Sequence, residues 1–189
     1  EKHNLDIAPH GKTTMAPQLF SDQIKHGAWG ITAGAINQIQ VMFDFGIKKV
    51  LLANQLLGKS HLETIASYIN LNKNFSFYCF VDSIEQFSNI KKNLGDQNLT
   101  NPINLLPEVG AENGRTGIRK KEDFLKLVNI IGEDSSKNFT FAGISSYEGI
   151  AAVAMKGSDA VHDFCSKIED IINDIPVSYT HLTLPTILL

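Results

Sequence analysis

The chain has 189 residues, of which 43% are hydrophobic and 20% are charged, and its formal net charge is −3 at pH 7. These values are typical of a globular chain long enough to bury a sizeable core, and they exclude a strongly basic nucleic-acid-binding protein. No apolar run reaches the roughly 18 residues needed to span a bilayer, so we expect a cytoplasmic protein with neither nucleic acid nor a membrane as a partner.

Short apolar runs alternate with amphipathic segments along the chain. The apolar runs predict strands at 5–8, 28–33, 48–54, 75–81, 103–109 and 139–146. The amphipathic segments predict helices near 14–26, 35–45, 60–73, 83–95, 120–133 and 158–173. Strands that are apolar on both faces and are separated by helices predict a parallel sheet with right-handed crossovers.

Two architectures fit these six βα units, a doubly wound sheet and a (β/α)8 barrel. No GxGxxG motif follows the first strand, which disfavours a dinucleotide-binding sheet. Units of roughly 25–30 residues extrapolate to a barrel of about 250 residues. We therefore predict an α/β fold, namely a partial (β/α)8 TIM-type barrel with about six of its eight βα units.

The stretch APHGKTTMAP (8–17) places Lys12 at the turn between the first strand and the first helix. Pro9 cannot continue a central strand, and Thr13 or Thr14 is the expected N-cap of the helix. In α/β proteins, ligands bind at this end of the sheet because helix N-termini and loop amides meet anionic groups there. Lys12 is therefore either a ligand-binding residue or an ordinary surface charge.

Polar residues also follow the other predicted strands. Each has an ordinary structural interpretation, such as a helix cap for Asp82 and Ser83, a turn residue for Asn54 and a solvated charge for Glu148. Taken together they line one rim, where they would suit an anionic ligand with a reactive carbonyl group. The rim residues are His10, Lys12, Thr32, Asn54, Gln55, Asp82, Ser83, Arg115, Tyr147 and Glu148.

Five motifs carry a resemblance to a known family. They are PHGKTTMAPQLF, GAWGIT, VLLANQLLG, EVGAENGRTGIR and GISSYEG. Together they resemble the N-terminal barrel of the fold-type III pyridoxal-phosphate enzymes, the alanine racemase N-terminal domain superfamily. The resemblance runs from about residue 5 to 150 and favours the branch of the amino acid deaminases, D-threonine aldolase and D-serine dehydratase. Thr14 stands where the aldolase pattern usually has histidine.

This resemblance implies that pyridoxal 5'-phosphate is the cofactor and that Lys12 is the catalytic lysine forming an imine with it. It also implies that Arg115 lies near the phenolic oxygen of the cofactor, where a permanent cation keeps that oxygen ionised. His10, Gln55 and Tyr147 are the remaining cofactor-binding candidates. The glycines of GAENGRTG would let the backbone pass close to the cofactor ring.

The implied function is a pyridoxal-phosphate-dependent lyase acting on D-hydroxy amino acids, by dehydration and deamination or by retro-aldol cleavage. A D-amino acid is the expected substrate, and the full-length protein is expected to be a homodimer. Two alternatives remain open, an amino acid racemase and a non-catalytic pyridoxal-phosphate-binding homeostasis protein.

Both ends of the sequence suggest a fragment. Residues 1–176 are expected to form a partial alanine-racemase-like barrel domain that is inactive by itself. Residues 177–189 contain VSYTHLTLPT, which resembles a sequencing adapter read through in frame, and we expect them to make few core contacts. The histidines show no ligand spacing, so no metal site is predicted, and Cys79 and Cys165 are expected to be buried free thiols.

Overall fold

The computed structural model describes residues 5–149, 158–176 and 187–188. Its strands are β1 (Asp6–Ile7), β2 (Ile31–Ala33), β3 (Lys49–Gln55), β4 (Ser76–Val81), β5 (Ile103–Val109), β6 (Phe139–Phe141), β7 (Ser145–Ser146) and β8 (Ile187–Leu188). Its helices are α1 (Pro17–Lys25), α2 (Ile36–Asp44), α3 (Lys59–Leu71), α4 (Ile84–Leu94), α5 (Lys121–Gly132) and α7 (Ser158–Asn173). Within these described ranges, no helix combines the length and apolarity needed to cross a membrane.

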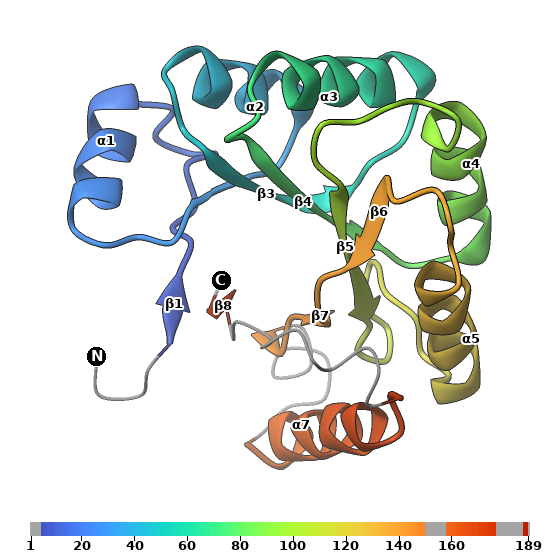
Figure 1. The fold of residues 1–189 in the computed structure, drawn as a ribbon. Helices are drawn as coiled ribbons and strands as arrows, with labels where there is room; N and C mark the ends of the chain where they lie inside the picture. Colours follow the sequence, from blue (N-terminus) through green and yellow to red (C-terminus); the bar gives the residue numbers. More distant parts are fainter. Residues whose placement is uncertain (1–4, 150–157, 177–186, 189) are drawn as a thin grey trace.

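Consecutive strands pair side by side in one sheet, in the order β2-β3-β4-β5-β6, and β7 also pairs with β5. Every one of these pairings is parallel. The sheet is curved, with helices α1 to α5 arranged around its outer side (Figure 1). The predicted α/β class and parallel TIM-barrel-like sheet are therefore confirmed.

The first predicted strand differs from expectation, because β1 pairs with β8 in a separate two-stranded sheet. The chain after β1 contacts the main sheet through an isolated bridge between His10 and Thr32. Thr32 anchors this contact, since its hydroxyl donates to the Ala8 carbonyl oxygen at 2.8 Å and its N–H donates to the Pro9 carbonyl oxygen at 2.9 Å. Of the predicted tail 177–189, only β8 lies within the described residues.

The last predicted strand, 139–146, is divided into β6 and β7. Gly143 lies between the two parts with a φ of 134°, a conformation that L-residues rarely adopt and that interrupts regular pairing. The break lets the chain pair with β5 a second time, closer to the carboxyl end of that strand.

Alternate residues of the strands pack on opposite faces of the sheet. On β3, for example, Val50 and Leu52 belong to the large core beneath the helices, whereas Leu51 belongs to a small cluster on the inner face. The other buried members of the inner cluster are Phe80 and Leu106. The outer core is apolar. Polar side chains therefore lie on the inner face, at the carboxyl ends of the strands, where they can form a site.

Helix α1 begins later than predicted. Its N-cap is Ala16, with Pro17 in the first turn and no side-chain cap, so the predicted cap at Thr13 or Thr14 is wrong. The fixed φ of proline favours the first helical position, and Met15 just before it has a φ of 43°. The turn that carries Lys12 is consequently longer than expected.

Both cysteines are free thiols, as predicted, but only one of them is buried. Cys79 lies in the outer core, where burial raises the pKa of its thiol to about 12. Cys165 is exposed on α7, so the prediction of burial is wrong for that residue. The exposure of Cys165 depends on which side of the amphipathic helix it lies, and the number of cysteines in the sequence does not reveal that.

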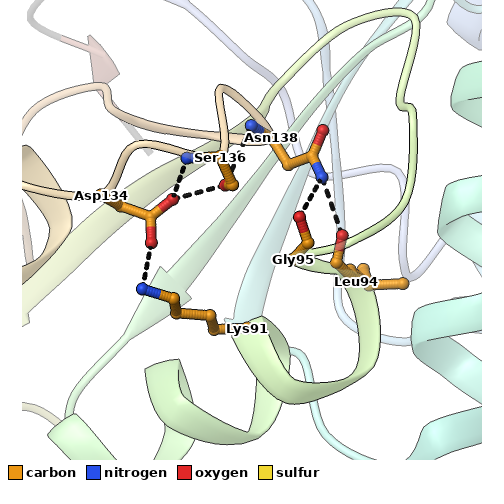
Figure 2. A network of polar contacts seen from close by, with 6 residues as sticks. All are labelled: Lys91, Leu94, Gly95, Asp134, Ser136 and Asn138. Atoms are coloured by element: carbon orange, nitrogen blue, oxygen red, sulfur yellow. Dashed lines mark hydrogen bonds and ion pairs between the residues drawn. The ribbon is translucent and has the colours of Figure 1, made fainter.

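An ion pair fastens the connection between α5 and β6 to helix α4 (Figure 2). Lys91 Nζ lies 2.7 Å from Asp134 Oδ2, and the Asp134 side chain is only 1% exposed. Burial by itself would raise the pKa of Asp134, but the hydrogen bonds from Lys91 and Ser136 outweigh it and the pKa is lowered. The connection is thus held in place by a charged carboxylate.

Asn138 completes this network at the C-terminal end of α4 (Figure 2). Its amide nitrogen donates to the carbonyl oxygens of Leu94, Gly95 and Gln97, at 2.8, 3.1 and 2.6 Å. Helix ends leave carbonyl groups without intrahelical partners, and a buried carbonyl without a partner is costly. Asn138 therefore stabilises the α4 terminus and the entry into β6 together.

Replacing Asn138 with alanine should lower the free energy of unfolding by about 2–3 kcal/mol, because buried carbonyl groups lose their donor. Chemical denaturation measures the change. Asn89→Ala, on the exposed side of α4, is the matched control and should change stability by less than about 0.5 kcal/mol. Equal effects of the two substitutions would contradict the role of Asn138.

Candidate functional site

A cavity of about 470 Å³ opens at the carboxyl ends of the strands. All five site residues selected from the sequence line it, although they come from four separate parts of the chain. The lining residues are His10, Lys12, Ala53, Asn54, Gln55, Phe80, Glu108, Arg115, Thr116, Ser146 and Tyr147. The expected convergence on one rim is thus present in the structure, while the roles assigned to these residues stay predictions.

Lys12 has a fixed backbone and an exposed side chain. Gln38 Nε2 donates to the Lys12 carbonyl oxygen at 3.3 Å, and Gln38 Oε1 accepts from the Gly34 N–H at 2.8 Å. The Lys12 stem lies along Gly34, where an added Cβ would be 3.3 Å from Lys12 Cδ. The loop after β2 therefore orients Lys12 while its amine stays accessible from the cavity.

His10 lies beside Lys12 at the same end of the cavity. Burial, and secondly the positive charge of Lys12, lower the pKa of His10 below its ordinary value of 6.5. The imidazole is accordingly neutral near pH 7. A neutral imidazole can both donate and accept a hydrogen bond, so His10 suits contact with a polar ligand.

The loop 110–119, which carries Arg115, folds back on itself. Gly117 has a φ of 90°, and a Cβ there would lie 2.5 Å from the Gly110 nitrogen, so only glycine fits. The Arg119 guanidinium donates to the carbonyl oxygens of Gly114 and Gly117. These glycines let the loop pack against its own backbone, a role that the sequence analysis did not foresee.

Arg115 and Tyr147 are both exposed at the cavity. Arg115 projects from the 110–119 loop, and Tyr147, which is 54% exposed, directly follows β7. Neither side chain contributes to the buried core, so both are free to contact a ligand. Their exposure contrasts with the burial of Glu108 nearby.

Two carboxylates meet at Gln55, and one of them, Glu108, was not recognised from the sequence. Gln55 Nε2 donates to Asp82 Oδ2 at 3.1 Å and to Glu108 Oε2 at 3.0 Å. Asp82 was expected to cap helix α4 together with Ser83, but Ser83 alone caps it, accepting from the Gln86 N–H. The signal for Glu108 was available, because it is a lone acid within the apolar strand INLLPEV.

The structure offers no arrangement for a metal ion in the part of the chain that it describes. Within 5–149 and 158–176, no three His, Cys, Asp or Glu residues are grouped so that they could hold one. Glu108, an acid that lines the cavity, instead accepts hydrogen bonds from the neutral donors Gln55 and Thr116.

Lys12→Gln should raise the pKa of His10 toward its ordinary value but not fully, since burial persists after the positive charge is removed. Titration of the imidazole by NMR measures this pKa. Lys25→Gln, on α1, removes a lysine outside the cavity and should leave the His10 pKa unchanged. An identical His10 titration in wild type and Lys12→Gln would show that the two side chains are not neighbours in solution.

Comparison with known proteins identifies an aldolase as a relative. No protein-family model matches the sequence. A D-threonine aldolase from Arthrobacter sp is 24% identical over 149 residues, which are 79% of this chain and 38% of that protein.

Solved structures share the fold over nearly the whole chain. A D-threonine aldolase from Filomicrobium marinum has a TM-score of 0.76 at 23% identity, covering 97% of this chain and 47% of its own. An alanine racemase from E.faecalis has a TM-score of 0.72 at 14% identity, covering 98% of this chain and 51% of its own. A D-threo-3-hydroxyaspartate dehydratase from Delftia sp. HT23 has a TM-score of 0.69 at 18% identity, covering 91% of this chain and 46% of its own.

The chain spans about half the length of these solved structures, and less of the Arthrobacter aldolase. The predicted resemblance is confirmed at the level of fold. The chain has the TIM-barrel-like fold of the N-terminal domain of the fold-type III pyridoxal-phosphate enzymes, with D-threonine aldolase, alanine racemase and D-threo-3-hydroxyaspartate dehydratase as structural neighbours.

Proposed function

We propose that this chain binds pyridoxal phosphate in the cavity and belongs to a lyase acting on D-hydroxy amino acids. The observation that carries the proposal is the convergence of His10, Lys12, Gln55, Arg115 and Tyr147 on one cavity. The cavity lies at the end of the sheet where barrel enzymes place their active sites.

The cavity fits the cofactor in size, and its lining residues fit the cofactor in chemistry. A volume of about 470 Å³ lies within the roughly 300–1,000 Å³ typical of small-molecule sites. The lining offers a primary amine, a guanidinium, an imidazole and a phenol, and pyridoxal phosphate carries an aldehyde, a phenolic oxygen and a phosphate. Each polar group of such a ligand therefore has a complementary type of side chain available.

Lys12 is the residue that we assign to the aldehyde. Its backbone is held by Gln38 while its amine is accessible, so the nitrogen can form a covalent bond to a ligand carbon and can also carry a proton to or from Cα. When bound, the cofactor supplies a conjugated ring that withdraws electrons from Cα of the substrate. His10, beside Lys12 and neutral, is placed to exchange hydrogen bonds with the same ligand.

Arg115 is the residue that we assign to the phenolic oxygen. A guanidinium keeps its charge at every physiological pH and presents donors in a fixed plane, so it stabilises an anionic oxygen in one position. Tyr147 stands at the exposed edge of the cavity, where it would pack against a ligand, and Gln55 approaches from the strand ends.

The names of the structural neighbours favour a lyase. D-threonine and D-threo-3-hydroxyaspartate both carry a hydroxyl group on Cβ, the feature that retro-aldol cleavage and dehydration share. Retro-aldol cleavage of D-threonine yields glycine and acetaldehyde, whereas dehydration and deamination of D-serine yield pyruvate and ammonia. The likeness to alanine racemase supports racemisation as the second candidate. Racemisation would be identified by a change in the chirality of the substrate without formation of a cleavage or dehydration product.

In the full-length protein, replacement of Lys12 by alanine should abolish covalent attachment of the cofactor, and with it turnover, because no other amine is placed on the firmly held turn. Protein incubated with pyridoxal phosphate is reduced with borohydride, digested and analysed by mass spectrometry for a pyridoxyl group. The control Lys92→Ala, which replaces an exposed lysine of α4, should retain the modification at Lys12. A pyridoxyl group found elsewhere in wild type, with Lys12 unmodified, would refute the assignment.

In the full-length protein, Arg115→Lys should lower cofactor affinity and kcat/KM by about tenfold or more, since a point ammonium cannot reproduce a planar guanidinium. Thermal unfolding should change little, because Arg115 is exposed and contributes little to the core. Cofactor titration and steady-state kinetics measure the two effects. Kinetics close to those of wild type would show that Arg115 does not face the cofactor.

A further inference from the structure

Gln55 joins the ends of three neighbouring strands. It is the last residue of β3, and its amide nitrogen Nε2 donates to Asp82 Oδ2 at 3.1 Å and to Glu108 Oε2 at 3.0 Å. Asp82 directly follows β4, and Glu108 is the penultimate residue of β5. One amide group therefore bridges two acids that come from the next two strands of the sheet.

The chemistry of its partners determines how the Gln55 amide is turned. An amide nitrogen carries two N–H donors, whereas an ionised carboxylate only accepts hydrogen bonds. An amide rotated by half a turn would direct its oxygen at both acids and lose both hydrogen bonds. Because its two donors are engaged, Gln55 has none left for a phosphate or a phenolic oxygen of a ligand. Its role at the cavity that it lines must therefore differ from that of Lys12 or Arg115.

Each of the two acids in turn holds one residue of the loop after β5. Asp82 Oδ2 accepts from the Gly117 N–H at 3.1 Å, and Glu108 Oε1 accepts from the Thr116 hydroxyl at 3.0 Å. Thr116 and Gly117 are the two residues that follow Arg115 in the sequence. An unbroken series of hydrogen bonds therefore leads from the Gln55 amide through both acids to the segment that carries Arg115.

The bridging amide also separates the two acids. Asp82 Oδ2 and Glu108 Oε2 both lie within 3.1 Å of the same nitrogen atom. Two carboxylates this close repel each other unless a donor lies between them. Without the amide of Gln55, we expect the acids to move apart and the loop that is bonded to them to lose its fixed position.

We propose that Gln55 is a positioning residue for the loop that carries Arg115. By donating to both acids at once, it fixes the two carboxylates to which the loop is bonded. Gln55 acts on Arg115 through the backbone of the loop, without direct contact between the two side chains. The inference rests on the proposed function only where it concerns the cofactor that Arg115 would face.

The same loop contains an internal control. The Ile118 N–H donates to the backbone carbonyl oxygen of Glu108 at 2.8 Å, and the Gly110 N–H donates to the Ile118 carbonyl oxygen at 3.0 Å. These bonds join backbone atoms and do not involve the Gln55 side chain. Hydrogen exchange at the Ile118 N–H therefore reports whether the loop stays folded, whereas exchange at the Gly117 N–H reports its bond to Asp82.

The experiment compares two methionine substitutions in the full-length protein. Gln55→Met keeps the length of the side chain and removes its donors, and Gln40→Met is the same substitution at an exposed position of α2. Hydrogen–deuterium exchange is measured at single residues by mass spectrometry with electron-transfer fragmentation. In Gln55→Met, exchange at Gly117 should become about fivefold faster or more, as expected for the loss of one hydrogen bond, while exchange at Ile118 stays as in wild type. Gln40→Met should change neither.

Cofactor affinity gives a second measurement, which a merely structural role would not affect selectively. Pyridoxal phosphate is compared with 3-deoxypyridoxal 5'-phosphate, which lacks the phenolic oxygen assigned to Arg115. Gln55→Met should lower the affinity for pyridoxal phosphate by about tenfold, the effect of weakening one hydrogen bond to a charged group. Its affinity for the deoxy compound should equal that of wild type, and Lys12 should still be modified after borohydride reduction.

Unchanged exchange at Gly117 in Gln55→Met would overturn the inference. Faster exchange at both Gly117 and Ile118 would also overturn it, because the loop as a whole would then have lost its structure. Equal losses of affinity for the two cofactor forms would have the same consequence. A wild-type protein that binds neither form, but in which Gln55→Met speeds exchange at Gly117 alone, would refute the proposed function and support the positioning role.

Discussion

Parallel hydrogen bonding between consecutive strands is the constraint on which the site depends. Because β2 to β6 all run in the same direction, their carboxyl ends lie at one rim of the curved sheet. Gln55, Asp82 and Glu108 come from three neighbouring strand ends, 27 and 53 residues apart from Gln55 along the chain, yet they share hydrogen bonds. An antiparallel arrangement of the same segments would place these residues at opposite edges.

The polar groups at this rim are divided by burial. The acids are held among the strand ends by Gln55, Thr116 and the Gly117 N–H, whereas Lys12 and Arg115 are exposed toward the cavity. In the part of the chain that the structure describes, no ion pair neutralises Lys12 or Arg115. This arrangement fits a site for a ligand that carries both an anionic group and a carbon open to attack by an amine.

The structural neighbours show how one fold accommodates several reactions. An aldolase, a racemase and a dehydratase share this fold with the chain at 14–23% identity. Barrel enzymes vary their chemistry through the loops that follow the strands, while the sheet beneath stays the same. In this chain, the loop after β5 carries Arg115 and is held to the strand ends by hydrogen bonds from Thr116 and Gly117.

Periodicity and local composition were sufficient to predict most elements of this protein, but not the start of α1 or the division of 139–146 into β6 and β7. INLLPEV predicted β5 with its observed bounds, because a run of apolar residues buried on both faces has few other stable arrangements. The order of strands and helices then determined the parallel sheet, and the PHGKTT and GRTGIR motifs located Lys12 and Arg115. The residues at the ends of the strands were also identifiable, since topology brings them to a common rim.

Only the tertiary structure decided which partners these residues have. Asp82 precedes a helix, so its sequence context suggested a cap, but the Gln55 amide and the Gly117 N–H reach it across the sheet. Helix α1 begins only at Pro17, after the N-cap Ala16, because the backbone at Met15 adopts a left-handed conformation. Local sequence determines the conformations that a segment favours, whereas hydrogen bonds between distant segments depend on the relative positions of strands in the folded chain.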